Sequence, residues 1–504
     1  MPLRLTAGSL VRVLIVGLSG CTGPSAASWS PGPAPGGQTA HGHPAPRLGP
    51  ARHRRPAAPA GHGARRPARR HRRTRRPPAP GRAPRRRRPG GGRGRRDPAR
   101  PRRPRGAARP GHRPAAPPLC PPPLPPPPLA VAAAADLAAS VLNPSLDSWD
   151  QAPAASALEA LVTRALAREA GAADALVTTG GTESNQLAVL LARETLGTGL
   201  RIVHGANAHH SVHRAAWLLG LPDPVVVPAP AGTLDPAALD EALTRVPGPH
   251  LVVATAGTTD AGLVDPLPAI ADRCAAHGAR LHTDAAYGAG LLFSARRRPL
   301  LAGLEAADTV ALDLHKLGWQ PIPAGLLAVA DAADLAVLHH RADYLNADDD
   351  TDAGLPDLLG RSPRTSRRPD VLKAAVTLKT LGRTGLGALV DEVCDLAEEF
   401  AALVHERPGL ELHAPPTLST VLFRPARATD ADVAAVRRTL LATGRAVLGR
   451  ARAGGRLWLK ATLLNPHTRR ADLAALLALV ETAAGTGAAT PTPPGTAPEG
   501  HHAP

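Results

Sequence analysis

Thr178-Thr179-Gly180-Gly181-Thr182-Glu183-Ser184-Asn185 stands between a short apolar run, Ala175–Thr178, and an amphipathic run, Asn185–Leu196. The first run is typical of a buried strand, and the second is typical of a helix with one apolar face. The two glycines let the backbone approach a ligand closely, and the helix start offers free N–H groups that suit a phosphate. A glycine turn that only caps the helix fits the same residues. The stretch therefore predicts a strand–turn–helix unit with a candidate phosphate site.

The alternation of short apolar runs with amphipathic runs continues to about Asp331. It predicts a mostly parallel sheet covered by helices on both faces, which is the architecture of α/β proteins. Further strands are expected at Arg201–Val203, Pro224–Val227, Leu251–Ala256, Arg280–Thr283, Thr309–Leu312 and Gly325–Val329, and helices at Leu158–Ala170, Val212–Leu219 and Pro266–His277.

Sequence of a different kind flanks this alternating region. Upstream, a Pro-rich segment leads into an apolar helix, Ala130–Leu142. Downstream, the polar and acidic residues 334–360 indicate a loop, and the elements after them predict a small α+β domain. Its helices are expected at Val371–Leu381 and Leu386–Arg407, and its strands at Thr417–Phe423 and Arg456–Thr462.

Charge is distributed unevenly along the 504 residues. Residues 1–128 hold 28 of the 60 Lys and Arg residues, all of them Arg, against one acid, Asp97, and the rest of the chain carries a formal net charge of −8. The run Arg52–Arg113 lacks large apolar residues and is expected to be disordered. It fits a non-native extension from a wrong start site or reading frame, or a nucleic-acid-binding tail. Without it the charge balance gives no sign of a nucleic-acid partner.

Nothing in the sequence predicts a membrane protein, because no apolar run is long enough to span a bilayer. The run Leu10–Leu18, followed by Cys21, resembles a lipoprotein signal, but Arg12 interrupts it. The four cysteines are scattered without metal-ligand spacing, as in a protein from a reducing compartment: Cys21, Cys120, Cys274 and Cys394. We therefore expect a cytoplasmic protein without a metal site.

Two more polar positions follow expected strands. Asp284 comes at the carboxyl end of Arg280–Thr283, where α/β folds place ligands. Its carboxylate could pair with a protonated pyridine nitrogen or simply cap a helix. His209, in His209-His210-Ser211, could stack on a flat heteroaromatic ring or be an exposed surface residue.

Lysine is scarce, which narrows the search for a Schiff-base residue to Lys316. The other lysines are Lys373 and Lys379, on an expected exposed helix face, and Lys460, in an apolar strand. Only Lys316 directly follows a strand, in Asp313-Leu314-His315-Lys316. A Schiff-base lysine needs an amine that loses its proton readily, as desolvation or nearby positive charge provides. A surface lysine at a strand end is the simpler alternative.

A glycine turn, a histidine, an aspartate and a lysine thus follow one another in a fixed order. With the longer stretches around them they resemble the group II pyridoxal-phosphate (PLP) decarboxylases of aromatic, acidic and diamino amino acids, over residues 120–480. The matching stretches are Asn143–Glu159, Val177–Arg193, Ala208–Gly220, Ala254–Asp265, His282–Gly288 and Asp313–Gln320. The resemblance implies an α/β fold of the PLP-dependent aminotransferase-like kind (fold type I), with a mostly parallel large-domain sheet and a small C-terminal α+β domain.

The resemblance also implies roles for individual residues around the PLP. Lys316 is expected to bind the cofactor covalently, Asp284 to pair with its ring nitrogen and His209 to stack on its ring. Gly181 and Thr182 are expected to hold the phosphate with help from Asp313. Three more residues are expected to contact the cofactor: Thr259, Ala286 and His315.

The implied activity is PLP-dependent decarboxylation of an L-amino acid to an amine and CO2. Ala342-Asp343-Tyr344-Leu345-Asn346 resembles the mobile catalytic loop, in which Tyr344 would protonate the substrate carbon, with His209 as the alternative donor. Four segments look most like the bacterial diamino-acid branch, which acts on 2,4-diaminobutyrate, lysine or ornithine. They are the segments around Trp149, Tyr344-Leu345-Asn346, Arg364–Lys373 and Lys460–Pro466. An aromatic or acidic amino acid is the alternative substrate.

The N-terminal region departs from the family. Pro117–Pro121 stands where a His-containing segment is expected, and the Arg/Pro run replaces an arm that wraps the partner subunit. Relatives have their active site at a dimer interface, so a homodimer is expected. A PLP-binding protein inactivated by this N-terminus is a further alternative.

The expected organisation divides the chain into five parts. They are a disordered extension (1–118), a remnant of the N-terminal arm (119–155), a PLP-binding large domain (156–345), a small domain (346–484) and a disordered tail (485–504). The pair Arg367-Arg368 is expected to anchor the catalytic loop and the small domain.

Overall fold

The computed structural model describes residues 126–340, 345, 348–355 and 358–486, all of which belong to one compact unit of the chain. The predictions for residues 1–118, Cys120, Tyr344 and residues 487–504 fall outside this described part. Within it, no helix is both long and apolar enough to cross a bilayer.

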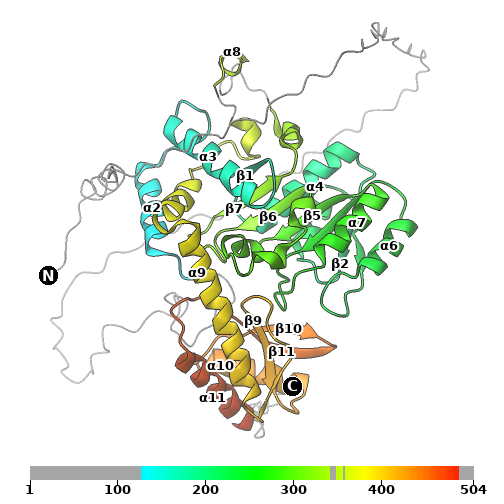
Figure 1. Cartoon of the computed structure of the whole chain (residues 1–504), viewed down its shortest axis with the longest axis vertical. Helices are drawn as coiled ribbons and strands as arrows, with labels where there is room; N and C mark the ends of the chain where they lie inside the picture. Colours follow the sequence, from blue (N-terminus) through cyan, green and yellow to red (C-terminus); the bar gives the residue numbers. More distant parts are fainter. Residues whose placement is uncertain (1–125, 341–344, 346–347, 356–357, 487–504) are drawn as a thin grey trace, which may run out of the picture. The chain divides into compact units, whose positions relative to one another are not determined.

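A seven-stranded sheet carries the larger of two hydrophobic cores (Figure 1). Its strands lie in the order β1-β7-β6-β5-β4-β2-β3, and all run parallel except β7, which is antiparallel to both β1 and β6. The expected α/β fold with a mostly parallel large sheet is confirmed. The strands are β1 Asp174–Thr178, β2 Arg201–Gly205, β3 Val225–Val227, β4 His250–Thr255, β5 Arg280–Ala285, β6 Thr309–Asp313 and β7 Gly325–Val329.

Helices cover both faces of this sheet, and the strands are apolar on both faces for that reason. In β4, Val252 and Ala254 pack in the core of α3, α6 and α7, whereas Leu251 and Val253 pack on the other face with α4 and α5. This alternation follows from the two-residue period of a strand. The helices are α2 Ala130–Leu142, α3 Pro153–Glu169, α4 Gly181–Leu196, α5 Ser211–Leu218, α6 Pro236–Arg245 and α7 Leu267–His277.

Helix α6 was not among the predicted helices, although its start has a clear local signal. The side chain of Asp235 accepts a hydrogen bond from the backbone N–H of Ala237, and Pro236 occupies the first helical position. Short 3₁₀ helices complete the connections: η1 Gly288–Phe293, η2 Arg298–Leu301, η3 Leu304–Ala306, η4 Ala332–Leu338 and η5 Leu359–Arg361.

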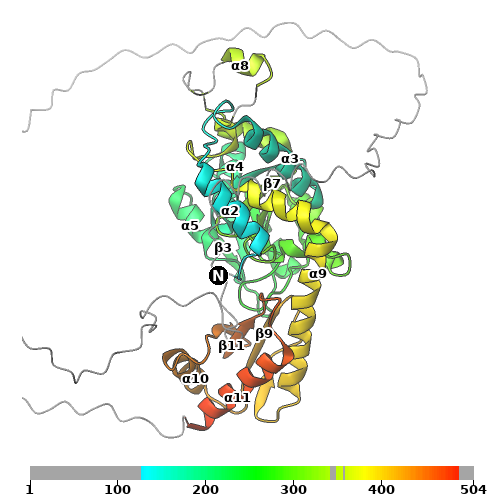
Figure 2. The same cartoon turned by 90° about the vertical axis from the view of Figure 1, so that its left-hand side faces the viewer.

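Helix α9, Val371–His405, extends from the large sheet to the small one (Figures 1 and 2). Gly382 interrupts it with φ 65° and ψ −178°, between the two helices that the sequence predicts. Residues of α9 up to Cys394 pack in the core of the large sheet, and those from Leu396 onward pack in the second core. One helix therefore serves both cores, and the expected domain limits at 155/156 and 345/346 stay predictions.

The second core lies on a four-stranded antiparallel sheet of order β10-β11-β9-β8. The expected small α+β unit is present. Strands β8 and β10 were not predicted, although Gly454 and Gly455, both with positive φ, mark the hairpin turn between β10 and β11. The elements are β8 Leu410–Leu412, β9 Thr420–Pro425, α10 Asp430–Ala442, β10 Gly449–Ala453, β11 Arg456–Thr462 and α11 Arg470–Thr486.

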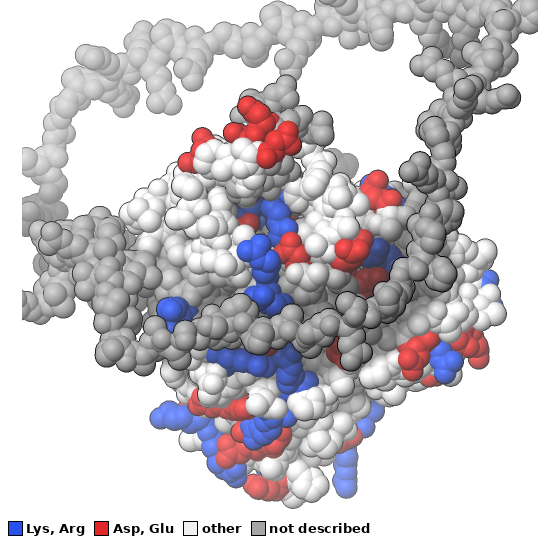
Figure 3. Space-filling model, turned by 45° about the horizontal axis from the view of Figure 1, so that its top comes forward, with Lys and Arg blue, Asp and Glu red and all other residues white. Residues whose placement is uncertain are grey.

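Two predictions are wrong, the loop at residues 334–360 and the exposure of Lys373. Residues 334–360 contain η4, η5 and a short helix α8, Asp348–Asp352, where acidic side chains gather at the top of Figure 3. Lys373 is not on an exposed face, because its side chain is 1% exposed and its Nζ lies 2.9 Å from Asp136 and 3.3 Å from Asp370. These two carboxylates, one from α2 and one beside the start of α9, compensate the buried ammonium.

Candidate active site

The carboxyl ends of β1, β2, β4, β5 and β6 meet at one edge of the large sheet, because these strands are parallel. A cavity of about 460 Å³ lies there, with Lys460 and Thr462 of β11 on its wall. The predicted site residues that the structure describes all line this cavity: Gly181, Thr182, His209, Thr259, Asp284, Ala286, Asp313, His315 and Lys316. Tyr344 lies outside the described residues.

The turn after β1 requires glycine at two adjacent positions. Gly180 has φ 151°, which L side chains rarely adopt, and a Cβ at Gly181 would lie 2.7 Å from the Cβ of Ala286. Gly181 and Thr182 begin α4, so the unpaired backbone N–H groups of its first turn lie beside the cavity. Such N–H groups, with the positive end of the helix dipole, favour a phosphate.

Lys316 lies in the turn after β6 and is partly exposed to the cavity. Its Nζ is 3.0 Å from Oδ2 of Asp313, and Nε2 of His315 is 3.4 Å from the same oxygen. Burial lowers the pKa of His315, and Asp313 opposes that shift. The other oxygen of Asp313 is buried without a hydrogen-bond partner among the described residues. Asp313 is thus seen as a counter-ion of Lys316, and its expected role at the phosphate stays a prediction.

Asp284 is a buried carboxylate at the end of β5, in the middle of the sheet edge. Its Oδ2 accepts a hydrogen bond of 2.7 Å from Nδ2 of Asn185, and its Oδ1 accepts one of 3.1 Å from the backbone N–H of Ala286. Both neighbours donate, as a carboxylate oxygen requires of its partners. This anion can pair with a cationic ring nitrogen placed in the cavity.

His209 follows β2, and its ring is positioned by a hydrogen bond with Ser211. Nδ1 of His209 lies 2.8 Å from the hydroxyl oxygen of Ser211. Burial lowers the pKa of His209, an effect that Asp284 partly opposes. An uncharged imidazole of this kind can stack on a ring in the cavity and offer its remaining nitrogen to a substrate.

Sequence reasoning missed three buried polar residues behind the cavity, Asn185, Ser211 and His282, and one lysine on its wall, Lys460. Nζ of Lys460 donates a 2.8 Å hydrogen bond to the backbone carbonyl of Thr259, and burial lowers the pKa of this lysine. The sequence did contain a signal for Lys460. Lysine is scarce in this chain, and a cationic side chain in an apolar strand needs a partner that compensates its charge.

A second cavity, of about 740 Å³, adjoins the first. His209 and Thr259 line both cavities, and Asp260 and Arg452 lie on the wall of the second. Asp260 is exposed, and its charge raises the pKa of Lys460 against the effect of burial. The two cavities together therefore hold one exposed carboxylate and several cations.

The family model for the conserved domain of pyridoxal-dependent decarboxylases matches residues 129–426. The chain belongs to this family. The match covers the large sheet, α9 and the start of the small sheet, and so includes every described site residue except those of β11. The decarboxylase is accordingly a PLP-dependent carboxy-lyase that acts on an amino acid.

Two bacterial relatives extend the likeness beyond the conserved domain. The decarboxylase is 41% identical over 356 residues to the L-2,4-diaminobutyrate decarboxylase of Rhizobium meliloti, covering 67% of this chain and 72% of that protein. It is 32% identical over 386 residues to the L-2,4-diaminobutyrate decarboxylase of Acinetobacter baumannii, covering 69% and 76%.

A solved structure of a related protein has a similar fold. The glutamate decarboxylase domain of the diaminobutyrate-pyruvate transaminase and L-2,4-diaminobutyrate decarboxylase from Vibrio parahaemolyticus matches with a TM-score of 0.65 at 33% identity, covering 73% of this chain and 81% of that one. The resemblance to the diamino-acid branch of the family is thereby confirmed.

The residues of the cavity fit PLP. The glycine turn leaves no room for a side chain where α4 begins, and Asp284 offers a buried anion for the pyridinium nitrogen. Lys316 supplies the amine, and the buried oxygen of Asp313 lacks a partner among the described residues. PLP, when bound, supplies the electron sink that decarboxylation needs.

The pair Arg367-Arg368 connects the start of α9 with α2 and α3. Arg367 forms two hydrogen bonds to Glu159 of α3, and Arg368 contacts Asp136 of α2 as well as Asp370. The expected anchoring of the catalytic loop and the small domain by this pair stays a prediction.

Proposed function

We propose that this enzyme decarboxylates L-2,4-diaminobutyrate, releasing CO2 and leaving 1,3-diaminopropane. The identity to two L-2,4-diaminobutyrate decarboxylases, each over about two thirds of this chain, carries the proposal. Lysine and ornithine are the nearest alternatives, since they carry the same two amines on longer chains. An aromatic or acidic amino acid is the more distant alternative.

The charges in the two cavities favour a substrate with a second amine. Asp284 and Asp313 have close partners within the protein, whereas Asp260 is exposed and interacts with Lys460 only through its charge. An ammonium on the substrate side chain would be attracted to Asp260, and a second carboxylate would be repelled by it. Lys460 provides a cation on the other side of Thr259, suited to the α-carboxylate.

The roles of the site residues follow from their positions. Lys316 would hold the cofactor and take part in proton exchange with the substrate amine. Asp284 would keep the ring nitrogen charged, and His209 would cover the ring. Tyr344 is proposed to protonate the carbon after CO2 leaves, with His209 as the alternative donor.

The remaining assignments concern the walls of the cofactor site. Gly181 and Thr182 would hold the phosphate at the start of α4, with Asp313 beside them. Thr259, Ala286 and His315 would contact the cofactor from the other strand ends.

Release of CO2 from a panel of amino acids tests the proposal. With PLP supplied, the enzyme should release CO2 fastest from L-2,4-diaminobutyrate, and Lys316→Ala should abolish both the turnover and the visible absorbance of the lysine-bound cofactor. Asp260→Asn should lower the preference for diamino acids about tenfold, the effect expected from one solvent-accessible charge contact. Preference for glutamate or an aromatic amino acid would contradict the assignment of the substrate.

We also propose that the enzyme is a homodimer. Large apolar side chains are exposed on α2, namely Leu137, Val141 and Leu142, and Ile322 on the wall of the first cavity is 56% exposed. A partner subunit covering these residues would remove apolar surface from water. Sedimentation velocity should give the mass of two chains for the wild type, and Val141→Asp with Leu142→Asp should shift it to one.

The compartment we propose is the cytoplasm. Cys274 and Cys394 are unpaired and buried, as thiols in a reducing environment commonly are. Fractionation of cells that express the full chain, followed by CO2 release from each fraction, tests this assignment.

A further inference from the structure

A chain of hydrogen bonds connects the ring-nitrogen carboxylate with the histidine that faces the cavity, and Asn185 lies at its centre. Nδ2 of Asn185 donates to Oδ2 of Asp284 at 2.7 Å and to the hydroxyl oxygen of Ser211 at 2.8 Å. Its Oδ1 lies 2.9 Å from Nε2 of His282, whose Nδ1 lies 2.8 Å from the hydroxyl of Thr309. All of these side chains are buried.

The direction of these hydrogen bonds is fixed by the chemistry of the partners. A carboxylate only accepts, so the NH2 side of the Asn185 amide must face Asp284 and its oxygen must face His282. That oxygen also only accepts, so Nε2 of His282 must carry a proton. Burial lowers the pKa of His282, and Asp284 and the backbone of Thr309 oppose that shift. Nδ1 of His282 faces Thr309, with the hydroxyl oxygen at 2.8 Å and the backbone carbonyl oxygen at 3.2 Å.

The same reasoning extends from Asn185 to His209. Because Asn185 already donates to the hydroxyl oxygen of Ser211, the Ser211 proton is free to point at Nδ1 of His209, 2.8 Å away. The backbone N–H of Ser211 also donates to this nitrogen, at 3.3 Å. With two donors aimed at Nδ1, the proton of a neutral His209 must lie on Nε2.

We propose that Asn185 is a positioning residue that fixes two features of the active site at once, the orientation of the Asp284 carboxylate and the Nε2–H tautomer of His209. It acts through these partners and does not itself line the cavity. His209 then has a proton to give on Nε2 and no lone pair there to receive one. It serves as a hydrogen-bond donor toward bound substrate and not as a base.

This inference deepens the proposed function, on which its catalytic meaning rests, but the states it concerns can be measured without turnover. The first experiment records ¹⁵N chemical shifts of histidine side chains in the full chain labelled at histidine, with and without PLP. His209→Gln identifies the signals of His209. The expected result is a neutral ring with the proton on Nε2 in both samples.

Variants separate the two branches of the network. Asn185→Ala should change the ring state of His209 and weaken PLP binding about ten- to a hundredfold, as loss of a hydrogen bond to a buried charge does. Ser211→Ala cuts only the branch to His209, so it should alter the ¹⁵N shifts while PLP affinity stays within about twofold. Ser184→Ala is the matched control, because it removes buried hydrogen bonds to Leu326 and Thr178 from the adjacent position of α4 and touches neither branch.

The outcomes decide the proposal whether or not the substrate assignment holds. A proton on Nδ1 of His209 in the wild type overturns it. If Asn185→Ala does not fold, the Ser211→Ala spectrum still decides the His209 branch. Only the backbone N–H of Ser211 then remains to donate to Nδ1, so the ¹⁵N shifts of His209 should move, and shifts identical to those of the wild type overturn the proposal. Failure to decarboxylate L-2,4-diaminobutyrate with the expected tautomer intact would contradict only the proposed substrate.

Discussion

Replacing Glu159 by alanine should destabilise the enzyme by about 3–5 kcal/mol, because it leaves the charge of Arg367 buried without its partner. Nη1 and Nη2 of Arg367 donate to the two carboxylate oxygens of Glu159 at 2.6 and 2.7 Å. The two side chains are only 1% and 5% exposed. Water therefore cannot replace the lost carboxylate, and the guanidinium keeps its full desolvation penalty.

A second variant separates the stability lost through the unpaired charge of Arg367 from the stability lost through poorer packing. Glu159→Leu combined with Arg367→Met removes both charges and keeps apolar volume, so it should recover most of the stability lost in the single variant. Urea denaturation followed by circular dichroism, with midpoints and slopes fitted by linear extrapolation, gives the free energies of unfolding.

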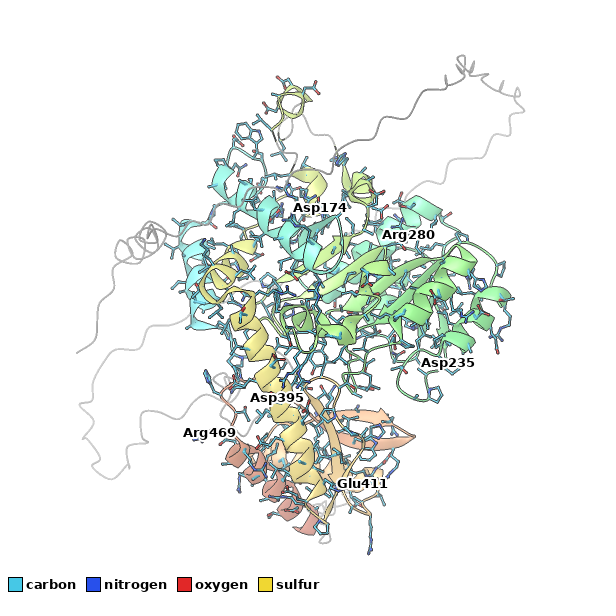
Figure 4. All side chains as sticks on the ribbon, viewed as in Figure 1. Asp174, Asp235, Arg280, Asp395, Glu411 and Arg469 are labelled. Atoms are coloured by element: carbon cyan, nitrogen blue, oxygen red, sulfur yellow. The ribbon has the colours of Figure 1, made fainter. Side chains whose placement is uncertain are left out.

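The chain offers a matched control in Glu411, labelled on the small unit in Figure 4. Arg456 donates to both of its carboxylate oxygens, as Arg367 does to Glu159, but these side chains are 45% and 35% exposed. Glu411→Ala should shift the urea midpoint far less, since water solvates the arginine that remains. Equal shifts in the two single variants, or a double variant no more stable than Glu159→Ala, would refute the reasoning.

Three further predictions follow from the site and the cores. Gly181→Ala places a Cβ 2.7 Å from that of Ala286, and overpacking of about 1–3 kcal/mol should lower PLP affinity about 5- to 150-fold in equilibrium dialysis. Burial holds the pKa of His282 below its ordinary value, so as pH falls below about 6.5 the unfolded chain gains a proton that the folded chain does not, and stability is lost. Urea midpoints should therefore fall more steeply from pH 7 to 5 in the wild type than in His282→Gln. Burial raises the pKa of Cys274 and of Cys394 to about 12, so iodoacetamide at about pH 8 should leave both unmodified until urea is added, as peptide mass spectrometry would reveal.

Much of the fold was accessible from local patterns. Strands such as Gly325–Val329 and Arg456–Thr462 agree with the structure to the residue, because short apolar runs between turn residues leave few alternatives. The glycine turn, His209, Asp284 and Lys316 could be found because each stands at or after the carboxyl end of an expected strand. A parallel sheet brings those ends together wherever the strands lie in the sequence. The resemblance to the family added the remaining residues of the cofactor site: Thr259, Ala286, Asp313 and His315.

What could not be predicted depends on contacts between distant segments. Lys373 has the periodicity of an exposed residue, and only the approach of α2 brings Asp136 to its ammonium. Asn185 looks like an ordinary residue of a first helical turn until α4 packs on the sheet beside Asp284 and His282. Lys460 belongs to the other sheet altogether, and no local signal relates it to Thr259.

The position of β7 in the large sheet has a consequence for how this protein folds during translation. Among the described strands, β1 pairs with β7 alone, and β7 is Gly325–Val329, the last strand of the sheet to leave the ribosome. Throughout synthesis of the intervening residues, Asp174–Thr178 has an open, apolar edge of the kind that attracts other chains. Lys316 is also translated late, so the nascent chain cannot capture its cofactor covalently until the sheet is nearly complete. Chaperone supply during translation should therefore govern the yield of active enzyme more than PLP supply does.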